Sequence, residues 1–563
     1  MKLNGAQILL ECLKKEGVDT FFGYPGGAII DIYDEIPRHP ELKHVLVRHE
    51  QAAVHAADGY ARVSGKVGVC LVTSGPGATN TVTGIATAYC DSIPLVIITG
   101  QVPTPLIGND AFQEVDIIGI TRPCTKHNYL VRDINQLARV LREAFYLARS
   151  GRPGPVLVDL PKDVIVGLTD FEWPETISMR SYNPTYKPNL NQIRRATDAI
   201  LAAERPVIFA GGGVILADAS EEINWLAKNL QIPVTASLMG LGAFPGSDDL
   251  WMGMIGMHGT FTANKAINNS DLIIAVGVRF DDRVTGRLNA FAPKARIVHI
   301  DIDPTSIRKN VEVHIPVVCD CRTALAGLRE NLTPRLGEKN WTEMHGPWLS
   351  QVKEWKAAHP LCYTESETIK PQQVIEMLDK ITGGDVIIAT EVGQNQMWAA
   401  QFFNYNKPRT LVTSGGLGTM GFGFPAAIGA QFAFPDKLVV DVAGDGSIQM
   451  NSQELATAVH NKLPVKILIL NNGYLGMVRQ WQELFYEHNY SSTNMEAQPD
   501  FVKLAEAYGA EGYRVTKAED LESTLRAALA SPATAIIDVH VEREENVYPM
   551  VPAGAALDEM LLV

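Results

Sequence analysis

Two polar residues that follow apolar runs, Asp445 and Asn472, are the strongest candidates for chemistry in this sequence. One run, from Leu438 to Ala443, leads into a Gly-Asp-Gly turn that contains Asp445, and a second, from Val465 to Leu470, leads into Asn-Asn. Runs rich in β-branched residues predict buried parallel strands. Because the carboxyl ends of parallel strands meet at one sheet edge, where α/β folds bind ligands, we expect the two polar residues to lie together.

The chemistry that this arrangement favours is the binding of Mg²⁺, which takes carboxylate and carbonyl oxygens and keeps positions for substrate phosphates and water. Asp445, the Asn472 amide oxygen and a main-chain carbonyl near Tyr474 would supply the ligands. Gly444 and Gly446 would let the backbone turn sharply and approach a diphosphate. The alternative interpretation is that Gly-Asp-Gly is an ordinary turn and Asn-Asn-Gly an ordinary loop. The strand-like run before each motif, and a spacing of one βαβ unit, favour the metal site.

The segment from Gly444-Asp445-Gly446 to Asn471-Asn472 resembles the diphosphate and metal motif of thiamine diphosphate enzymes. The longer sequence, from Gly5 to Pro552, resembles the biosynthetic acetohydroxyacid synthases. The resemblance implies three cofactors: thiamine diphosphate, Mg²⁺ and FAD. It also implies that pyruvate is decarboxylated and its two-carbon unit joined to a second pyruvate, giving 2-acetolactate, or to 2-ketobutyrate, giving 2-aceto-2-hydroxybutyrate. These reactions lead toward valine, leucine and isoleucine.

The composition is that of a multidomain α/β enzyme. The chain has 563 residues, of which 46% are hydrophobic and 20% charged, and this length requires several domains. A net charge of -14, with scattered basic residues, argues against a nucleic-acid partner. The N-terminal segment lacks the apolar core of a signal peptide, and no run is long enough to span a membrane. Seven dispersed cysteines fit reduced thiols, so we expect a cytoplasmic protein without a membrane partner.

Strand-like runs bounded by glycine alternate with helical patterns, which is typical of parallel βαβ units. We predict an α/β fold with three doubly wound parallel-sheet domains, and the resemblance implies that two thiamine diphosphate-binding domains flank a central FAD-binding domain. Polar passages at about 173–190 and 334–368 separate them. The expected domains are residues 1–180 for the pyrimidine, 190–340 for FAD, 365–545 for diphosphate and Mg²⁺, and 546–563 as a tail near the active site.

Glu50 is the candidate for proton transfer, and we expect it at the end of an apolar strand that begins at His44. Burial raises the pKa of a glutamate above about 4.3, so that it can share a proton with the cofactor's pyrimidine near neutral pH. A strand-end glutamate is ordinarily a solvated charge. However, Arg-His-Glu-Gln-Ala-Ala resembles the segment with the family's catalytic glutamate. In that family the glutamate and the metal motif come from different subunits, which implies a homodimer or larger oligomer with shared active sites.

The stretch Gly416–Gly421 spells Gly-x-Gly-x-x-Gly, a dinucleotide-binding fingerprint. A nicotinamide dehydrogenase is therefore an alternative, although no acidic residue is clearly placed at the end of the next strand. The resemblance implies instead that the Gly418 carbonyl faces the cofactor's 4′-amino group and that Met420 holds the cofactor in its bent form. An ordinary core methionine is the other interpretation of Met420.

Arg283 and Trp481 are the candidates for binding the second substrate. An arginine binds a carboxylate through two parallel hydrogen bonds, and the segment 279–284 resembles the biosynthetic enzymes; the alternative is a surface ion pair with a neighbouring aspartate. Trp481, near Val478, resembles the tryptophan that favours 2-ketobutyrate over pyruvate, a choice of one methylene worth about 1 to 3 kcal/mol. The alternative for Trp481 is a core or interface residue.

The resemblance implies roles for residues in several further motifs. The other active-site matches are Gly27, Phe112, Gln113 and Lys162. The other cofactor matches are Gly444, Gly446, Ser447 and Met477 for thiamine diphosphate, and Arg152, Gly211, Gly212, Gly213, Met257, His258, Arg279, Asp301 and Asp320 for FAD. The flavin has a largely structural role in the family. Cys319 stands where members commonly have glycine, which bears on flavin affinity.

Three other functions remain open on the sequence. A pyruvate oxidase or another carboligase would make acetate or acetyl phosphate. A dehydrogenase would depend on NAD and not on thiamine diphosphate. A catalytically silent scaffold would have no use for a buried carboxylate. The resemblance also implies a partner, a small regulatory subunit that mediates feedback by branched-chain amino acids.

Overall fold

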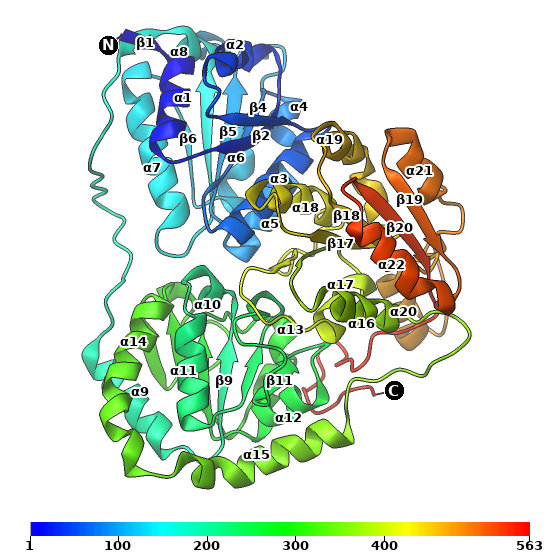
Figure 1. The fold of residues 1–563 in the computed structure, drawn as a ribbon. Helices are drawn as coiled ribbons and strands as arrows, with labels where there is room; N and C mark the ends of the chain where they lie inside the picture. The colour runs from blue at the N-terminus through cyan, green and yellow to red at the C-terminus, as the bar shows by residue number, and fades with distance from the viewer. Residues whose placement is uncertain (1, 563) are drawn as a thin grey trace.

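The structure is a computed structural model that describes residues 2–562. It contains three six-stranded sheets, one in each of three domains (Figure 1). Every strand pairing within these three sheets is parallel. The predicted α/β fold with three parallel-sheet domains is therefore confirmed.

The N-terminal domain has the strand order β3-β2-β4-β5-β7-β6. Its strands are β2 (Thr20–Tyr24), β3 (Lys43–Leu46), β4 (Gly68–Val72), β5 (Leu95–Gln101), β6 (His127–Leu130) and β7 (Pro155–Pro161). Its helices are α1 (Gly5–Lys15), α2 (Ile30–Glu35), α3 (Glu50–Ser64), α4 (Pro76–Thr79), α5 (Val82–Asp91), α6 (Ile117–Thr121), α7 (Leu137–Arg149) and α8 (Lys162–Val166). A small antiparallel sheet joins β1 (Lys2–Asn4) and β8 (Leu168–Asp170).

Glu50 does not end a strand, so that expectation is wrong. The strand β3 ends at Leu46, and Glu50 is the first residue of α3, with His49 at the N-cap. The His49 side chain accepts a hydrogen bond from the Gln51 backbone N–H at 3.1 Å. This cap satisfies one of the free amides of the first turn, and the chain therefore enters a helix at the point where the apolar run ends.

The central domain has the order β11-β10-β9-β12-β13-β14, which in chain order is the 3-2-1-4-5-6 arrangement of dinucleotide-binding folds. Its strands are β9 (Pro206–Ala210), β10 (Val234–Ala236), β11 (Trp251–Met254), β12 (Leu272–Val276), β13 (Arg296–Asp301) and β14 (Ile315–Val318). Its helices are α9 (Leu190–Ala202), α10 (Gly212–Leu216), α11 (Ser220–Leu230), α12 (Phe261–Asn269), α13 (Asp282–Thr285), α14 (Cys321–Leu332) and α15 (Trp341–Ala358).

The helix α15 lies in the segment that the sequence indicated as a domain boundary. It packs on the central domain: the Trp348 indole N–H donates to the Pro206 carbonyl at 3.1 Å. His345, also in α15, is fully buried and lies 2.6 Å from the Leu230 carbonyl oxygen. The central core therefore extends to α15.

The C-terminal domain has the order β16-β15-β17-β18-β20-β19. Its strands are β15 (Ile387–Thr390), β16 (Leu411–Val412), β17 (Val439–Gly444), β18 (Lys466–Asn471), β19 (Glu511–Val515) and β20 (Ala535–His540). Its helices are α16 (Pro371–Thr382), α17 (Gln394–Phe402), α18 (Gly423–Ala433), α19 (Leu455–His460), α20 (Gly476–Phe485), α21 (Phe501–Tyr508) and α22 (Leu521–Ala530). The tail beyond β20 returns to the central domain, where the Val551 N–H donates to the Met257 carbonyl at 2.8 Å.

The N- and C-terminal domains pack through α3 and α18, which lie against each other in Figure 1. Glycines allow this contact: a Cβ on Gly429 would stand 1.8 Å from the Ala56 carbonyl oxygen, and one on Gly59 would stand 2.1 Å from that of Ala426. Residues 171–189 contain no helix or strand and run along one side of the molecule to α9. Across residues 2–562, the helices include none with the length and apolar character that crossing a membrane requires.

Candidate functional site

Asp445 and Asn472 lie at one edge of the C-terminal sheet, as the sequence predicts. The strands β17 and β18 are parallel neighbours, with Gly444 opposite Leu470. Asp445 directly follows β17 and Asn472 directly follows β18. Both side chains are buried. The edge therefore carries one carboxylate and one amide in a place protected from water.

The Asp445 carboxylate has the surroundings of a cation ligand. Both of its oxygens are buried, and neither has a hydrogen-bond partner of good geometry in residues 2–562. Burial raises the pKa of Asp445 to about 7, because the ionised form has lost its hydration, although the nearby backbone N–H groups of Asn472 and Gly473 act to lower it. A bound divalent cation would offset this cost. The side chain therefore fits the predicted Mg²⁺.

Asn472 is held in place by its neighbours. Its Nδ2 donates to Gln394 Oε1 at 3.2 Å, and its Oδ1 accepts from the Tyr474 N–H at 3.1 Å. In the described part of the chain, no three His, Cys, Asp or Glu side chains are grouped as metal ligands. A site with one carboxylate suits Mg²⁺, because this ion takes its other ligands from amide and main-chain oxygens, water and phosphate.

The turn after β17 is tightly packed, with little space for a side chain at Gly446. The Gly444 N–H donates to Ser447 Oγ at 3.2 Å, and a Cβ on Gly446 would stand 2.7 Å from Leu475 Cδ2. The turn is therefore tight on its inner side. Successive backbone N–H groups of such a turn are natural partners for a diphosphate.

The loop with Gly418 and Met420 is held by buried polar groups. The Gly421 N–H donates to Glu391 Oε2 at 2.6 Å, and Asn451 Nδ2 donates to the Gly421 carbonyl at 2.6 Å. Gly418 and Gly421 have φ values of 73° and 86°, a left-handed conformation that favours glycine. The loop conformation is therefore fixed from both sides of Gly421.

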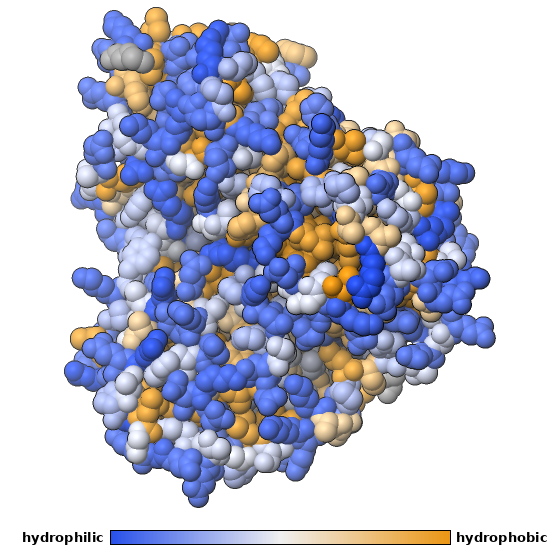
Figure 2. All heavy atoms as spheres, viewed as in Figure 1, coloured by the Kyte–Doolittle hydropathy of each residue, from blue (hydrophilic) through white to orange (hydrophobic). Residues whose placement is uncertain are grey.

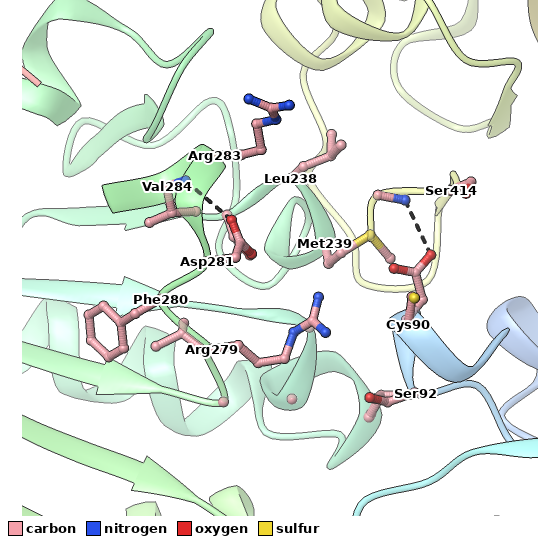
Figure 3. A pocket seen from close by; sticks show the side chains of 18 of the residues that line it. Cys90, Ser92, Leu238, Met239, Arg279, Phe280, Asp281, Arg283, Val284 and Ser414 are labelled. Atoms are coloured by element: carbon pink, nitrogen blue, oxygen red, sulfur yellow. Dashed lines mark hydrogen bonds between the residues drawn. The ribbon is translucent and has the colours of Figure 1, made fainter. Parts of the chain in front are cut away.

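A cavity of about 580 Å³ lies where the three domains meet. The predicted site residues that line it are Arg152, Gly212, Gly213, Met257, His258, Arg279, Arg283, Asp301, Asp320, Gly418, Met420, Met477, Val478 and Trp481. Figure 3 shows Ser92 of the N-terminal domain, Met239 of the central domain and Ser414 of the C-terminal domain around the same space. The residues predicted for FAD and those predicted for the thiamine pyrimidine therefore face one continuous cavity.

The glycines after β9 fit a bound diphosphate. A Cβ on Gly211 would stand 2.2 Å from the Gly277 carbonyl oxygen, and one on Gly213 would stand 2.6 Å from the Gly277 Cα. Gly277 directly follows β12, the neighbour of β9 at the point where the strand order reverses. Ligands of open α/β sheets bind at this point. Gly212 and Gly213 present backbone to the cavity there.

Polar groups surround the other parts of the flavin candidate site. Arg152 donates from Nη1 to Asp303 at 3.1 Å and from Nε to Ser92 Oγ at 2.8 Å. Burial raises the pKa of Asp301 to about 6. Asp320 caps α14 by accepting from the Thr323 N–H at 3.1 Å. These charged side chains fit a polar ligand that extends across the cavity.

The Cys319 thiol is engaged by the segment that joins the first two domains. It donates to the Tyr186 carbonyl at 2.9 Å, and Cys319 does not line the cavity. Cys321 does line it. The cysteine that replaces glycine in the motif therefore packs against this connecting segment.

Arg283 is available to a substrate carboxylate. Its side chain is 58% exposed, and Nη1 lies 3.7 Å from Asp282, too far for a strong ion pair. Figure 3 shows the guanidinium pointing away from Asp281, which instead accepts from the Val284 N–H at 3.2 Å. Trp481 faces the same cavity, with a buried indole nitrogen that has no partner in residues 2–562.

The predicted residues of the N-terminal domain do not reach this cavity. Glu50 Oε2 accepts from Asn80 Nδ2 at 2.9 Å, and Lys162 Nζ donates to the Gly27 carbonyl at 3.0 Å. Phe112 is 88% exposed. Gln113 adopts a positive φ of 58° where its backbone meets Gly75. These residues follow the carboxyl ends of their own sheet, and none of them lines the cavity described above.

Sequence reasoning missed several buried polar residues around the site. Glu391 and Gln394 follow β15, the third strand that ends at the metal edge, so strand-end position was an available signal. Asp441 lies within β17 and has two buried, unpartnered oxygens. Burial raises its pKa strongly, with a contribution from nearby Glu391. An aspartate inside an apolar run carries no spacing signal of this kind.

Family models match each of the three domains. They are described as the thiamine pyrophosphate enzyme N-terminal TPP binding domain over residues 3–120, the central domain over 193–328, and the C-terminal TPP binding domain over 391–539. The fold and the site therefore define the class of the three-domain thiamine pyrophosphate enzymes.

Curated relatives match the chain over its whole length. The acetolactate synthase isozyme 3 large subunit of Escherichia coli is 51% identical over 100% of this chain and 98% of the relative. The acetolactate synthase large subunit of Haemophilus influenzae is 50% identical with the same coverage, and the acetolactate synthase of Mycobacterium bovis is 49% identical over 99% of this chain and 91% of its own. The chain belongs to the family of acetolactate synthase large subunits, whose cofactors are thiamine diphosphate, Mg²⁺ and FAD.

Proposed function

We propose that this chain makes 2-acetolactate from two molecules of pyruvate, and 2-aceto-2-hydroxybutyrate from pyruvate and 2-ketobutyrate, in the cytoplasm. The observation that carries the proposal is the buried, unpartnered Asp445 carboxylate beside Asn472, in the domain that matches a TPP binding model. Asp445, Asn472 and the backbone near Tyr474 would hold Mg²⁺, and the Gly444–Ser447 turn would bind the diphosphate.

Bound thiamine diphosphate supplies a nucleophilic thiazolium carbon and accepts the electrons released when carbon dioxide leaves. The residues of the chain then have separate tasks. Gly418 and Met420 orient the pyrimidine within the loop fixed at Gly421. Glu50 holds the proton that the pyrimidine nitrogen exchanges. Gly212 and Gly213, which line the cavity, would hold FAD there in a structural role.

The second substrate is selected beside the cavity. Arg283 has an exposed guanidinium without a close partner and would bind the carboxylate of the second 2-ketoacid. Trp481 would form an apolar wall that prefers an ethyl to a methyl group, a difference of about 1 to 3 kcal/mol. These two residues also favour this function over a pyruvate oxidase, which has no second ketoacid to bind.

We also propose that the active site is shared by two copies of the chain. Glu50, Gly27, Gln113 and Lys162 follow the strands of a sheet that does not border the chain's own cavity. Large apolar side chains are exposed in both the N- and the C-terminal domain: Phe112, Leu417, Met450 and Val478. Apolar side chains also gather near the middle of the face in Figure 2, where the domains meet. Pairing two copies would cover such side chains and bring Glu50 to the other copy's cofactor.

A smaller regulatory subunit is the remaining proposed partner, since the curated relatives are named large subunits. The function is tested by measuring products from pyruvate with and without Mg²⁺ and thiamine diphosphate. We expect acetolactate only when both cofactors are present. Acetate or acetyl phosphate would support an oxidase instead, and activity that requires NAD would support a dehydrogenase.

A further inference from the structure

A short segment after the metal turn contacts both halves of the proposed site. It consists of two 3₁₀ turns, η10 (Ile448–Met450) and η11 (Ser452–Glu454), between Ser447 and α19. Two of its side chains, Asn451 and Glu454, are buried polar groups that bond to backbone far away in the sequence. Glu454 bonds to the N-terminal domain, whereas Asn451 bonds to the loop that contains Met420.

Glu454 reaches the N-terminal domain. Its Oε1 accepts from the Arg48 backbone N–H at 2.9 Å, and its Oε2 accepts from the Thr457 hydroxyl at 2.6 Å. Thr457 also lies 3.4 Å from the Leu46 carbonyl, the last residue of β3. The Glu454 side chain is fully buried, and a hydrogen bond to a buried carboxylate is about twice as strong as one between neutral groups.

The residues held by Glu454 determine where Glu50 lies. Residues 47–49 form the turn between β3 and α3, without regular secondary structure, and Glu50 is the first residue of α3. The position of its carboxylate therefore depends on this turn. A displacement of about 1 Å of a catalytic group can cost about a hundredfold in rate.

Asn451 supports the loop that contains Gly418 and Met420. Its Nδ2 donates to the Gly421 carbonyl at 2.6 Å, one residue beyond Met420. In the shared site, Met420 and Asp445 of one chain serve that chain's cofactor, whereas its Glu50 serves the partner's cofactor. Asn451 and Glu454, three residues apart, therefore support two different active sites.

We propose that Glu454 is a positioning residue for Glu50, so that the metal-binding domain of one chain sets the geometry of the active site that holds the other chain's cofactor. This inference rests on the proposed shared site. It predicts that Glu454 and Asp445 of the same chain belong functionally to different sites.

The test uses hybrid dimers of full-length chains that carry two different affinity tags, purified with all cofactors. One chain carries Glu454→Ala and the other Asp445→Asn. If Glu454 acts through Glu50, both defects fall in one site and the second site is intact, so the hybrid has about half the activity of a wild-type dimer. Activity as low as that of the two parent homodimers would overturn the proposal.

Two matched hybrids separate the possible failures. Glu50→Gln paired with Asp445→Asn must also give about half activity; if it does not, the shared site itself is wrong and the inference fails with it. Asn451→Ala paired with Asp445→Asn must keep no more than about half the activity of the Asn451→Ala homodimer, because each site then contains one defect. Half of the wild-type activity in that hybrid would show that Asn451 does not support the site that holds its own chain's cofactor.

Conservative variants distinguish positioning from folding. Glu454→Ala is expected to lower kcat about ten- to a hundredfold with the KM for pyruvate little changed. Glu454→Gln keeps an oxygen for the Arg48 amide and should restore kcat to within about threefold. Thr457→Val, a milder change, replaces Glu454→Ala in the hybrids if that chain does not fold. The double variant Glu50→Gln/Glu454→Ala should be no slower than Glu50→Gln alone, and an additive loss would contradict the proposal.

Discussion

The N- and C-terminal sheets have the same topology but present different chemistry. Numbered within each domain, both strand orders are 2-1-3-4-6-5, and both reverse between the first and third strands. At that point the N-terminal sheet has Thr73 after β4, and the C-terminal sheet has Asp445 after β17. One is a neutral hydroxyl and the other a buried carboxylate. The strand order thus places a ligand site, and the residue types at the strand ends decide which ligand it takes.

The two edges also differ in how their polar groups are satisfied. Glu50 accepts from Asn80, and Lys162 forms an ion pair with Asp31 at 2.9 Å. The Asp445 oxygens have no hydrogen-bond partner of good geometry in residues 2–562. Groups that already have protein partners and lie near the surface can act on a neighbouring molecule, whereas a buried carboxylate at a ligand-binding sheet edge is stabilised by a bound cation. This difference supports the proposal that the C-terminal edge binds the cofactor and the N-terminal edge transfers the proton.

The largest expected effect comes from Asp445→Asn. The change removes the only carboxylate in the proposed Mg²⁺ ligand set, so we expect loss of thiamine diphosphate binding and a fall in acetolactate formation of about a thousandfold or more. Calorimetric titration of the cofactor with Mg²⁺ measures the binding. The matched control is Thr73→Val at the corresponding strand end, whose hydroxyl is buried without a partner and should be replaceable with little effect. Equal losses in the two variants would contradict the comparison.

Glu50→Gln should separate binding from turnover. We expect cofactor affinity to be retained and kcat to fall about 10²- to 10⁴-fold, the range for a lost acid–base group. The measurement is acetolactate formation at saturating cofactor, with binding followed separately. Glu41→Gln, which removes an exposed carboxylate from the same domain, is the control. Full activity in Glu50→Gln would exclude this residue from the mechanism.

The sequence was sufficient to predict which residues lie at the sheet edges. It was not sufficient to predict buried polar groups that contact distant parts of the chain. Asp445 and Asn472 could be predicted because each follows an apolar run, and a strand end has a defined place in a parallel sheet. Glu454 and Asp441 could not be predicted, because the groups that surround their carboxylates come from elements far away in the sequence. For Glu50 the motif indicated a role, but the apolar pattern did not show that a helix begins there.

The segment that contains α15 is a second place where distant contacts decide the structure. Its charged residues and scattered tryptophans predicted a domain boundary, whereas the structure has a helix there that includes Pro347. Packing decided otherwise, because Trp341 and Trp348 are buried against the central domain. Tertiary contacts of this kind override local propensity and leave no periodic signal.

A substitution at the contact between the N- and C-terminal domains should have an intermediate effect. Gly429→Ala would place a methyl group 1.8 Å from a backbone oxygen of α3, and backbone cannot move aside easily. We expect the free energy of unfolding to fall by about 2 to 4 kcal/mol, with a matching loss of activity as α3 shifts. Gly327→Ala in α14 is the control, since its Cβ meets only side chains at ordinary contact distances of 3.7 to 3.8 Å. That change should be neutral or stabilise by up to about 1 kcal/mol.

The smallest expected effects distinguish two aspartates at corresponding places in the two sheets. Asp159 in β7 and Asp538 in β20 lie on strands with the same place in the two strand orders, next to the last, and are both buried. Burial raises the pKa of Asp159 to about 7, because its partners, the side chains of Thr99 and Gln101, are neutral. Burial acts on Asp538 as well, but His540, Asn471 and Arg514 donate to its carboxylate and lower its pKa.

The two pKa shifts predict opposite pH dependences. Asp159 binds a proton more tightly in the folded than in the unfolded chain, so the free energy of unfolding should fall as pH rises from about 4 to about 7, and Asp159→Asn should reduce that fall. Asp538 stabilises the fold when ionised, and its contribution is lost as pH falls through its pKa. Asp538→Asn should therefore destabilise the protein at pH 7 by about 1 to 2 kcal/mol and much less in acid. Thermal unfolding of both variants between about pH 2 and pH 8 tests this, because the pKa of Asp538 lies below its ordinary value of 3.8, and parallel curves would show that the neighbouring charges do not distinguish the two strands.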